Sequence, residues 1–166
     1  AQIICDRLPS AEKVRFCNSG TEATLIAIRL ARAYRKRWKV VKMEGGYHGD
    51  YDLMEISIRP ALEKAGPIEK PNSVPEDVGI PPSVVSDCII APFNKAEIAE
   101  RIITNHKDDL AAVILEPVPA VCGMIPPDPH FLKAVREVTS KYKIPLIFDE
   151  VISFRLAVGG CQEIYD

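Results

Sequence analysis

The sequence lacks an excess of charge of either sign. Its 21 lysine and arginine residues are balanced by 23 aspartate and glutamate residues, and 47% of its 166 residues are hydrophobic. A chain that binds nucleic acid is typically basic, and a disordered chain is typically poor in hydrophobic residues. The composition therefore argues against both classes and is that of an ordinary globular domain.

A long apolar stretch is missing as well. No run approaches the roughly 18 residues that a membrane-spanning helix requires. The first ten residues, AQIICDRLPS, have neither the basic start nor the cleavage site of a secretory signal. These absences predict a cytoplasmic protein with no membrane partner.

The cysteines and histidines show no metal-binding or disulfide pattern. There is no Cys-x-x-Cys pair, and the cysteines stand at irregular spacings at Cys5, Cys17, Cys88, Cys122 and Cys161. An odd number argues against a disulfide framework, and the missing pair argues against a zinc ribbon. His48, His106 and His130 also lack metal-site spacing. We expect reduced, mostly buried cysteines and no bound metal.

Short apolar segments bounded by turn residues are present and predict a buried sheet. The five predicted strands are residues 14–17, 39–43, 87–91, 111–115 and 144–148. Helical patterns lie between most of them, and strands that are buried on both faces and alternate with helices form parallel sheets. The sequence therefore predicts an α/β fold, a three-layer αβα sandwich around a mostly parallel sheet.

Three helices have recognisable starts or faces. Residues 21–37 carry a broad apolar face and a basic last turn. Asn94 with Glu97 resembles a capping box ahead of a second helix. Asp128 followed by Pro129 is typical of the start of a third.

Two regions depart from this alternation. Residues 60–86 contain six prolines and no clear periodicity, which predicts a long loop, either a lid or a plain surface excursion. At the ends, Ile3-Ile4 and Leu8-Pro9 resemble the tail of a helix already under way, and residues 158–162 trail off without a closing element. We therefore expect the chain to be a piece of a longer one.

Candidate site residues follow the predicted strands. In an open parallel sheet, ligands bind beyond the carboxyl ends of the strands. Four strands are followed by Asn18-Ser19-Gly20-Thr21, Gly45-Gly46-Tyr47-His48-Gly49, Glu116-Pro117 and Asp149-Glu150-Val151. We expect these polar and aromatic groups to converge on one rim of the sheet.

The corner formed by Ser19, Gly20 and Thr21 has two interpretations. Its hydroxyl groups, its accessible glycine backbone and the free N–H groups of a helix start would suit a phosphate. The same residues would also serve as a plain helix cap. The corner is neither a Walker loop nor a nucleophile elbow, because it lacks the Gly-Lys-Ser/Thr and flanking-glycine patterns.

The other candidates also have possible functional or structural roles. Asp149 ends an apolar run, so its carboxylate would bind a cationic ring nitrogen strongly or would cap a turn. Tyr47 would stack on a flat ring or pack as an ordinary loop residue. His48 would donate to a ligand, and Glu116 would satisfy loop N–H groups.

Taken together, these stretches resemble a known family, the class III pyridoxal-phosphate (PLP) aminotransferases, and within it the glutamate-1-semialdehyde 2,1-aminomutase branch. The matching stretches are VRFCNSGTEATLIAIRLARAYRKR, KMEGGYHGDYD, APFNKAEIAE, AAVILEPVPAVCGMIPPDPHFLKAVREVTSKYKIPLIFDEV and GGCQ. The resemblance implies the PLP-dependent transferase fold of type I. It further implies that residues 1–166 are the central part of the PLP-binding large domain, without the small domain.

The resemblance also implies a cofactor, PLP, and the residues that hold it. These residues would be Ser19, Gly20, Thr21, Tyr47, Glu116, Asp149 and Val151. The Ser-Gly-Thr corner would hold the phosphate, and Tyr47 would stack on the pyridine ring. Asp149 would keep the ring nitrogen protonated, while Val151 would pack against the opposite face. Glu116 would lie near the site.

The implied function is amino-group transfer. A small-molecule amino donor and a carbonyl acceptor would be the partners of a homodimeric, full-length enzyme, either an aminotransferase or an aminomutase. The family's Schiff-base lysine lies beyond the Asp-Glu-Val stretch, and no lysine follows Lys143 here. Val121 stands where the aminomutases carry an asparagine. The alternative is a non-catalytic remnant that keeps the fold.

Overall fold

A parallel sheet forms the centre of the computed structural model, which describes residues 1–8 and 10–165. Its strands are β1 (Lys39–Met43), β2 (Cys88–Ala91), β3 (Leu110–Leu115) and β4 (Leu146–Phe148). The spatial order is β2-β1-β3-β4, and each neighbouring pair is parallel. The predicted α/β fold with a parallel sheet is confirmed.

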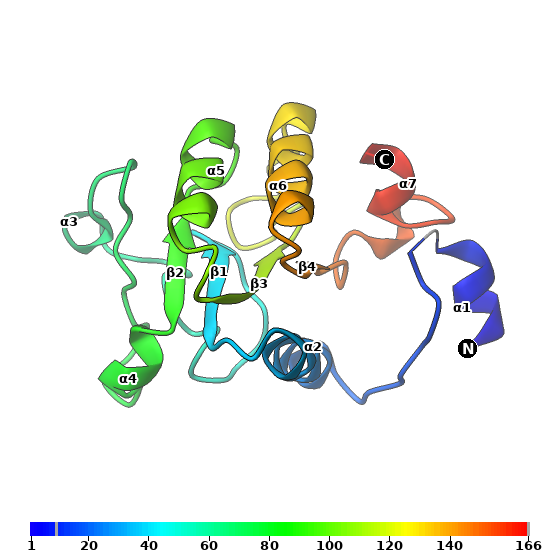
Figure 1. Ribbon diagram of the computed structural model, residues 1–166, viewed down its shortest axis with the longest axis horizontal. Coiled ribbons are helices and arrows are strands. Elements are labelled where there is room, and N and C mark those ends of the chain that lie inside the picture. The colour runs from blue at the N-terminus through cyan, green and yellow to red at the C-terminus, as the bar shows by residue number, and fades with distance from the viewer. Residues whose placement is uncertain (9, 166) are drawn as a thin grey trace.

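Helices cover both faces of this sheet (Figure 1). One face carries α5 (Ala96–Asn105) and α6 (Pro129–Lys141), and the other carries α2 (Gly20–Arg35). Val113 and Leu115 of β3 pack with the first pair of helices, while Ala112 and Ile114 pack on the side of α2. All six residues of β3 are buried, because successive side chains point to opposite faces and both faces are covered.

The predicted strand at residues 14–17 is wrong. These residues form no strand and join α1 (Gln2–Arg7) to α2 away from the sheet (Figure 1). Phe16 in this segment is 70% exposed. An apolar run becomes a strand when its backbone finds a ladder partner, and the described residues offer none here. Pro9, part of the predicted helix tail, lies outside the described residues.

Two predicted helix starts had different outcomes. The third helix begins as expected, since the Asp128 side chain accepts a hydrogen bond from the N–H of His130 and Pro129 is in the first turn. The capping box at Asn94 is wrong, because α5 follows Lys95. Asn94 has a φ of 56°, whereas an N-cap residue adopts extended backbone angles. Its side chain instead bonds Asp128 N and Pro126 O.

Residues 60–86 form an irregular excursion with two short helices, α3 (Leu62–Ala65) and α4 (Pro82–Val85). It is attached to the preceding segment by an antiparallel bridge between Ile56 and Pro75. The remaining short elements are the 3-10 turn η1 (Phe154–Leu156) and α7 (Cys161–Tyr165).

Arg35, in the last turn of α2, ties three elements together at the opposite end of the sheet from the strand carboxyl ends. Its guanidinium group donates to the carbonyl oxygens of Lys107, Leu110, Tyr142 and Lys143. Lys107 follows α5, Leu110 begins β3, and Tyr142 and Lys143 follow α6. Carbonyl groups near the end of a helix lack intrahelical donors and need other partners.

We expect Arg35→Met to lower the free energy of unfolding by about 2 kcal/mol, since hydrogen bonds from a charged donor are lost while several carbonyls stay partly buried. Urea unfolding of the complete reading frame that encodes this chain is the measurement. Arg29→Met, on an exposed position of the same helix, is the control. Equal effects at the two positions would contradict the role of Arg35.

Candidate functional site

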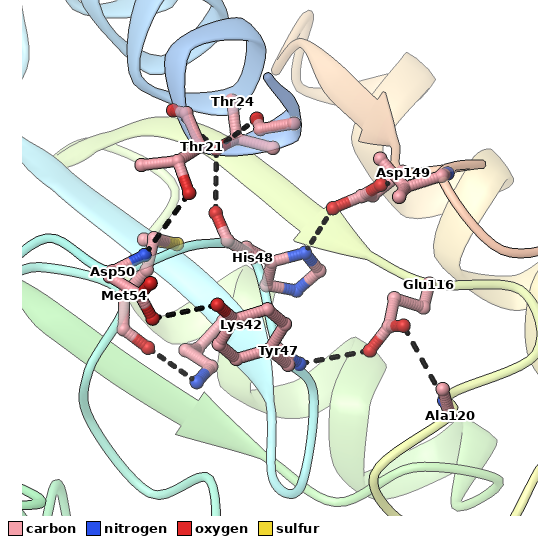
Figure 2. A network of polar contacts seen from close by, with 12 residues as sticks. Thr21, Thr24, Lys42, Tyr47, His48, Asp50, Met54, Glu116, Ala120 and Asp149 are labelled. Atoms are coloured by element: carbon pink, nitrogen blue, oxygen red, sulfur yellow. Dashed lines mark hydrogen bonds and ion pairs between the residues drawn. The ribbon is translucent and has the colours of Figure 1, made fainter.

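Four of the predicted site residues meet at the carboxyl ends of neighbouring strands. Asp149 directly follows β4, Glu116 directly follows β3, and Tyr47 and His48 lie on the segment that leaves β1. Because β1, β3 and β4 are adjacent, the three strand ends bring these side chains together (Figure 2).

Asp149 and His48 form the buried centre of the site. The Nδ1 atom of His48 lies 2.8 Å from Oδ2 of Asp149, and both side chains are almost completely buried. Oδ1 of Asp149 accepts from the N–H of Val151. Burial lowers the pKa of His48, although the Asp149 carboxylate opposes that shift. A neutral His48 whose Nδ1–H donates to the carboxylate satisfies Nδ1 of His48 and Oδ2 of Asp149.

The other ring nitrogen of His48 is unusual. Nε2 is buried and has no hydrogen-bond partner among residues 1–8 and 10–165. With the proton on Nδ1, Nε2 is an acceptor, and a buried acceptor without a donor costs free energy. Among the described residues, Asp149 is therefore the only hydrogen-bond partner of the His48 side chain.

Glu116 fixes the backbone around Tyr47. Its Oε2 accepts from the N–H of Tyr47 at 2.9 Å, and its Oε1 accepts from the N–H of Ala120 at 3.4 Å. Burial raises the pKa of this carboxyl, and the two backbone donors oppose the rise. Glu116 therefore joins the end of β3 to the loop that follows β1.

The ring of Tyr47 stands at the mouth of the site, and the residue is 37% exposed. Its hydroxyl donates to Oδ1 of Asp50 at 2.7 Å. This hydrogen bond is the main reason why the pKa of Tyr47 is raised. Asp50 therefore holds the hydroxyl end of the Tyr47 side chain, and Glu116 holds its backbone.

The Ser19-Gly20-Thr21 corner begins α2 beside these residues. Ser19 is the N-cap, and its hydroxyl accepts from the N–H of Glu22 at 3.1 Å. The Glu22 carboxylate in turn accepts from the N–H of Asn18. The Ser-x-x-Glu spacing at residues 19–22 is a capping signal that the sequence reading did not use.

Two hydrogen bonds and one close approach connect the start of α2 to the rest of the site. Thr24 donates to the carbonyl of His48 at 2.6 Å. The hydroxyl of Thr21 accepts from the N–H of Asp50 at 3.3 Å. A methyl group added to Gly20 would lie 3.0 Å from a methyl carbon of Val151, so the glycine allows close approach. All seven residues predicted to surround a cofactor therefore lie around one region.

Sequence reasoning missed Lys42. This residue lies in β1, is completely buried, and donates from Nζ to the carbonyls of Met54 and Ile56. Burial lowers its pKa to about 8. A lysine between the apolar residues Val41 and Met43, in a strand predicted to be buried on both faces, was the signal that would have revealed it.

Other site classes find no support in the described part of the chain. Residues 1–8 and 10–165 contain no group of three or more metal-ligating side chains. None of the described helices combines the length and hydropathy of a bilayer span. The five cysteines are free.

Comparisons with known proteins show which sequences and folds this chain resembles. Over 99% of the chain, 44% of residues are identical to glutamate-1-semialdehyde 2,1-aminomutase 2 of Brevibacillus brevis. The crystal structure of an omega-transaminase from Sphaerobacter thermophilus superposes with a TM-score of 0.94 at 44% identity and 99% coverage of this chain. A transaminase solved with PLP bound superposes with a TM-score of 0.88 at 35% identity, again over 99% of this chain.

The matches cover nearly all of this chain but only part of each relative. The chain spans about 37% of the length of each of these three proteins. A sequence profile described as aminotransferase class-III matches residues 1–154. The chain therefore belongs to the class-III aminotransferase family.

Proposed function

We propose that residues 1–166 are the central part of the PLP-binding large domain of an enzyme that moves an amino group between small molecules. The observation that carries this proposal is the buried Asp149–His48 pair, at 2.8 Å, where three strand ends and the start of α2 converge. The names of the aminomutase and transaminase relatives support amino-group transfer. A homodimer and a cytoplasmic location stay predictions.

The residues of the site fit PLP, which is a flat, anionic ring with a basic nitrogen. Asp149 offers a buried carboxylate, the group that binds a protonated ring nitrogen most strongly. Tyr47 presents an exposed ring, and Val151 lies against Gly20 on the corner side. When bound, PLP supplies the electron sink that stabilises a carbanion.

The helix-cap and phosphate readings of the corner are compatible. Ser19 uses an oxygen lone pair to cap α2, which leaves its O–H free to donate. The N–H groups of Gly20 and Thr21 belong to the first turn, where no intrahelical acceptor exists. A phosphate at this point would therefore find hydroxyl and backbone donors together with the positive end of a helix of 16 residues.

Each remaining side chain has a defined task in this proposal. Asp149 holds the proton on the ring nitrogen, because a negative charge beside it raises its basicity. His48 orients Asp149 through the Nδ1 hydrogen bond and stays neutral, since burial lowers its pKa. Glu116 holds the backbone of Tyr47, so that the ring faces the cofactor. Burial of the dyad excludes water from this interaction.

A charge reversal at the corner separates the cap from the phosphate site. Ser19→Asp retains an efficient N-cap residue, so we expect unfolding to be unchanged. It also places a carboxylate against the phosphate, so PLP affinity should fall about 10- to 100-fold. Titration with PLP, followed by absorbance, is the measurement, and Ser83→Asp on the exposed excursion is the control. Unchanged affinity would leave the corner a helix cap alone.

The proposed function itself is tested on the complete reading frame. We expect the protein purified with PLP to show visible absorbance from bound cofactor and to transfer the amino group of an added donor. The donors tested include glutamate 1-semialdehyde, the substrate named in the aminomutase relatives. Absence of bound PLP would overturn the proposal, whereas bound PLP without turnover on any donor would favour the non-catalytic remnant.

A further inference from the structure

Lys42 places an amine in the interior of the protein. It is the penultimate residue of β1, where its backbone is in register with Ile90 of β2 and Ile114 of β3. The side chain has no exposed surface. A buried ammonium group is costly unless its N–H groups are bonded, so the contacts of Nζ show what the residue does.

Nζ is bonded to the segment that carries the proposed ring-binding residues. We call residues 44–58 the site loop, which leaves β1, carries Tyr47 and His48, and returns to the end of the strand. The loop is closed by the hydrogen bond from Gly45 N to Ser57 O at 2.9 Å. Nζ of Lys42 reaches the returning part of the loop at the carbonyl of Met54, 3.1 Å away (Figure 2). It also donates to the carbonyl of Ile56 at 2.6 Å.

The returning part of the site loop also holds the excursion at residues 60–86. Ser57 N donates to Val74 O at 2.7 Å, and Glu76 N donates to Glu55 O at 3.0 Å. Lys42 is therefore bonded to the same returning part of the site loop that holds the excursion. Movement of this part would displace both the excursion and the Tyr47-His48 segment.

We propose that Lys42 is a positioning residue whose buried amine determines how tightly the site loop closes on the sheet. Its effect on a cofactor rests on the proposed function, because Tyr47 and His48 lie on this loop. The closure itself is a property of the chain and is measurable without PLP.

The charges around Nζ determine how closure depends on pH. The groups that face it are Cys88 of β2, Glu76 of the excursion, Glu116 after β3 and Glu55 of the site loop. Burial outweighs them and lowers the pKa of Lys42 from 10.5 to about 8. The neutral amine has two N–H donors, which match the two carbonyl acceptors.

The sign of the pH effect follows from linkage. In the closed loop the pKa of Lys42 is lowered to about 8, and in an opened loop it returns to that of a solvated amine, 10.5. At a pH between these two pKa values, opening of the loop is therefore accompanied by uptake of a proton. Closure is therefore favoured as pH rises above about 8. Below that pH the amine is charged in both states, and this added closure is lost.

Amide hydrogen exchange in the complete reading frame tests the proposal. We expect protection of the Gly45 and Ser57 amides, corrected for intrinsic rates, to rise about 10-fold from pH 8 to pH 9.5. Lys42→Met should abolish this rise and lower site-loop protection at every pH, while the Val113 amide of β3 changes less. Lys39→Met, on a half-buried residue of the same strand, should retain the wild-type profile.

Two outcomes would overturn the inference. One is a wild-type profile without a rise above pH 8, which needs no variant and is informative even if Lys42→Met fails to fold. The other is a Lys42→Met protein with an unchanged profile. A PLP titration run in parallel reports on the proposed function separately, since failure to bind PLP leaves the exchange result intact.

Discussion

Asp149→Asn is expected to cut amino-transfer turnover by at least about 100-fold, with little change in the fold. The amide is as large as the carboxylate, and its oxygen still accepts from Val151 N. Its nitrogen donates toward His48, which adapts by moving its proton from Nδ1 to Nε2. The negative charge is lost, so nothing in this position holds a ring nitrogen protonated.

Steady-state turnover and urea unfolding of the complete reading frame are the two measurements for Asp149. Asp109→Asn, in an exposed ion pair with Lys39, controls for the loss of one carboxylate. We expect it to leave turnover unchanged. Turnover of the Asp149 variant within about threefold of the parent would remove Asp149 from the proposed chemistry.

Gly49→Ala is expected to lower the free energy of unfolding by about 3 kcal/mol. Gly49 has a φ of +103°, and a methyl group there would lie 2.6 Å from the Cα atom of Thr21. The methyl group therefore meets the backbone of α2 rather than a side chain that rotates away. Either α2 or the site loop has to move, which separates the corner from Tyr47.

Gly123→Ala is a matched control for Gly49→Ala. Gly123 also has a positive φ, +96°, but a methyl group there meets no atom within 4 Å. We expect backbone strain alone at this position, about 1 kcal/mol. Urea unfolding of both variants measures the difference between them. Equal losses at the two glycines would show that the contact between Gly49 and Thr21 contributes nothing.

Several elements were predictable from the sequence because their signals are local. The apolar run at residues 39–43 is a strand as predicted, and the Asp128-Pro129 start of α6 follows from the chemistry of helix caps. The convergence of Glu116 and Asp149 was predictable once the sheet was taken as parallel, since strands that run in the same direction end at the same edge.

Other elements depended on neighbours that the sequence does not reveal. Residues 14–17 have the composition of a strand, yet a strand requires a partner for its backbone, and Phe16 is largely exposed. Asn94 with Glu97 has the spacing of a capping box, but the side chain of Asn94 bonds the segment ahead of α6. In both cases a contact distant in sequence, or its absence, outweighed the local pattern.

The sequence by itself determined the alternation of strands and helices, the rim where polar residues follow strands, and the resemblance to one enzyme family. These depend on periodicity, turn residues and the order of short motifs along the chain. The tertiary structure alone decided the pairing of His48 with Asp149, the buried hydrogen bonds of Lys42 and the close contact of Gly49 with Thr21. The residues of these pairs are separated by between 12 and 101 positions in the sequence. Burial, hydrogen bonding and steric contact over such separations arise only when the sheet and its helices have packed.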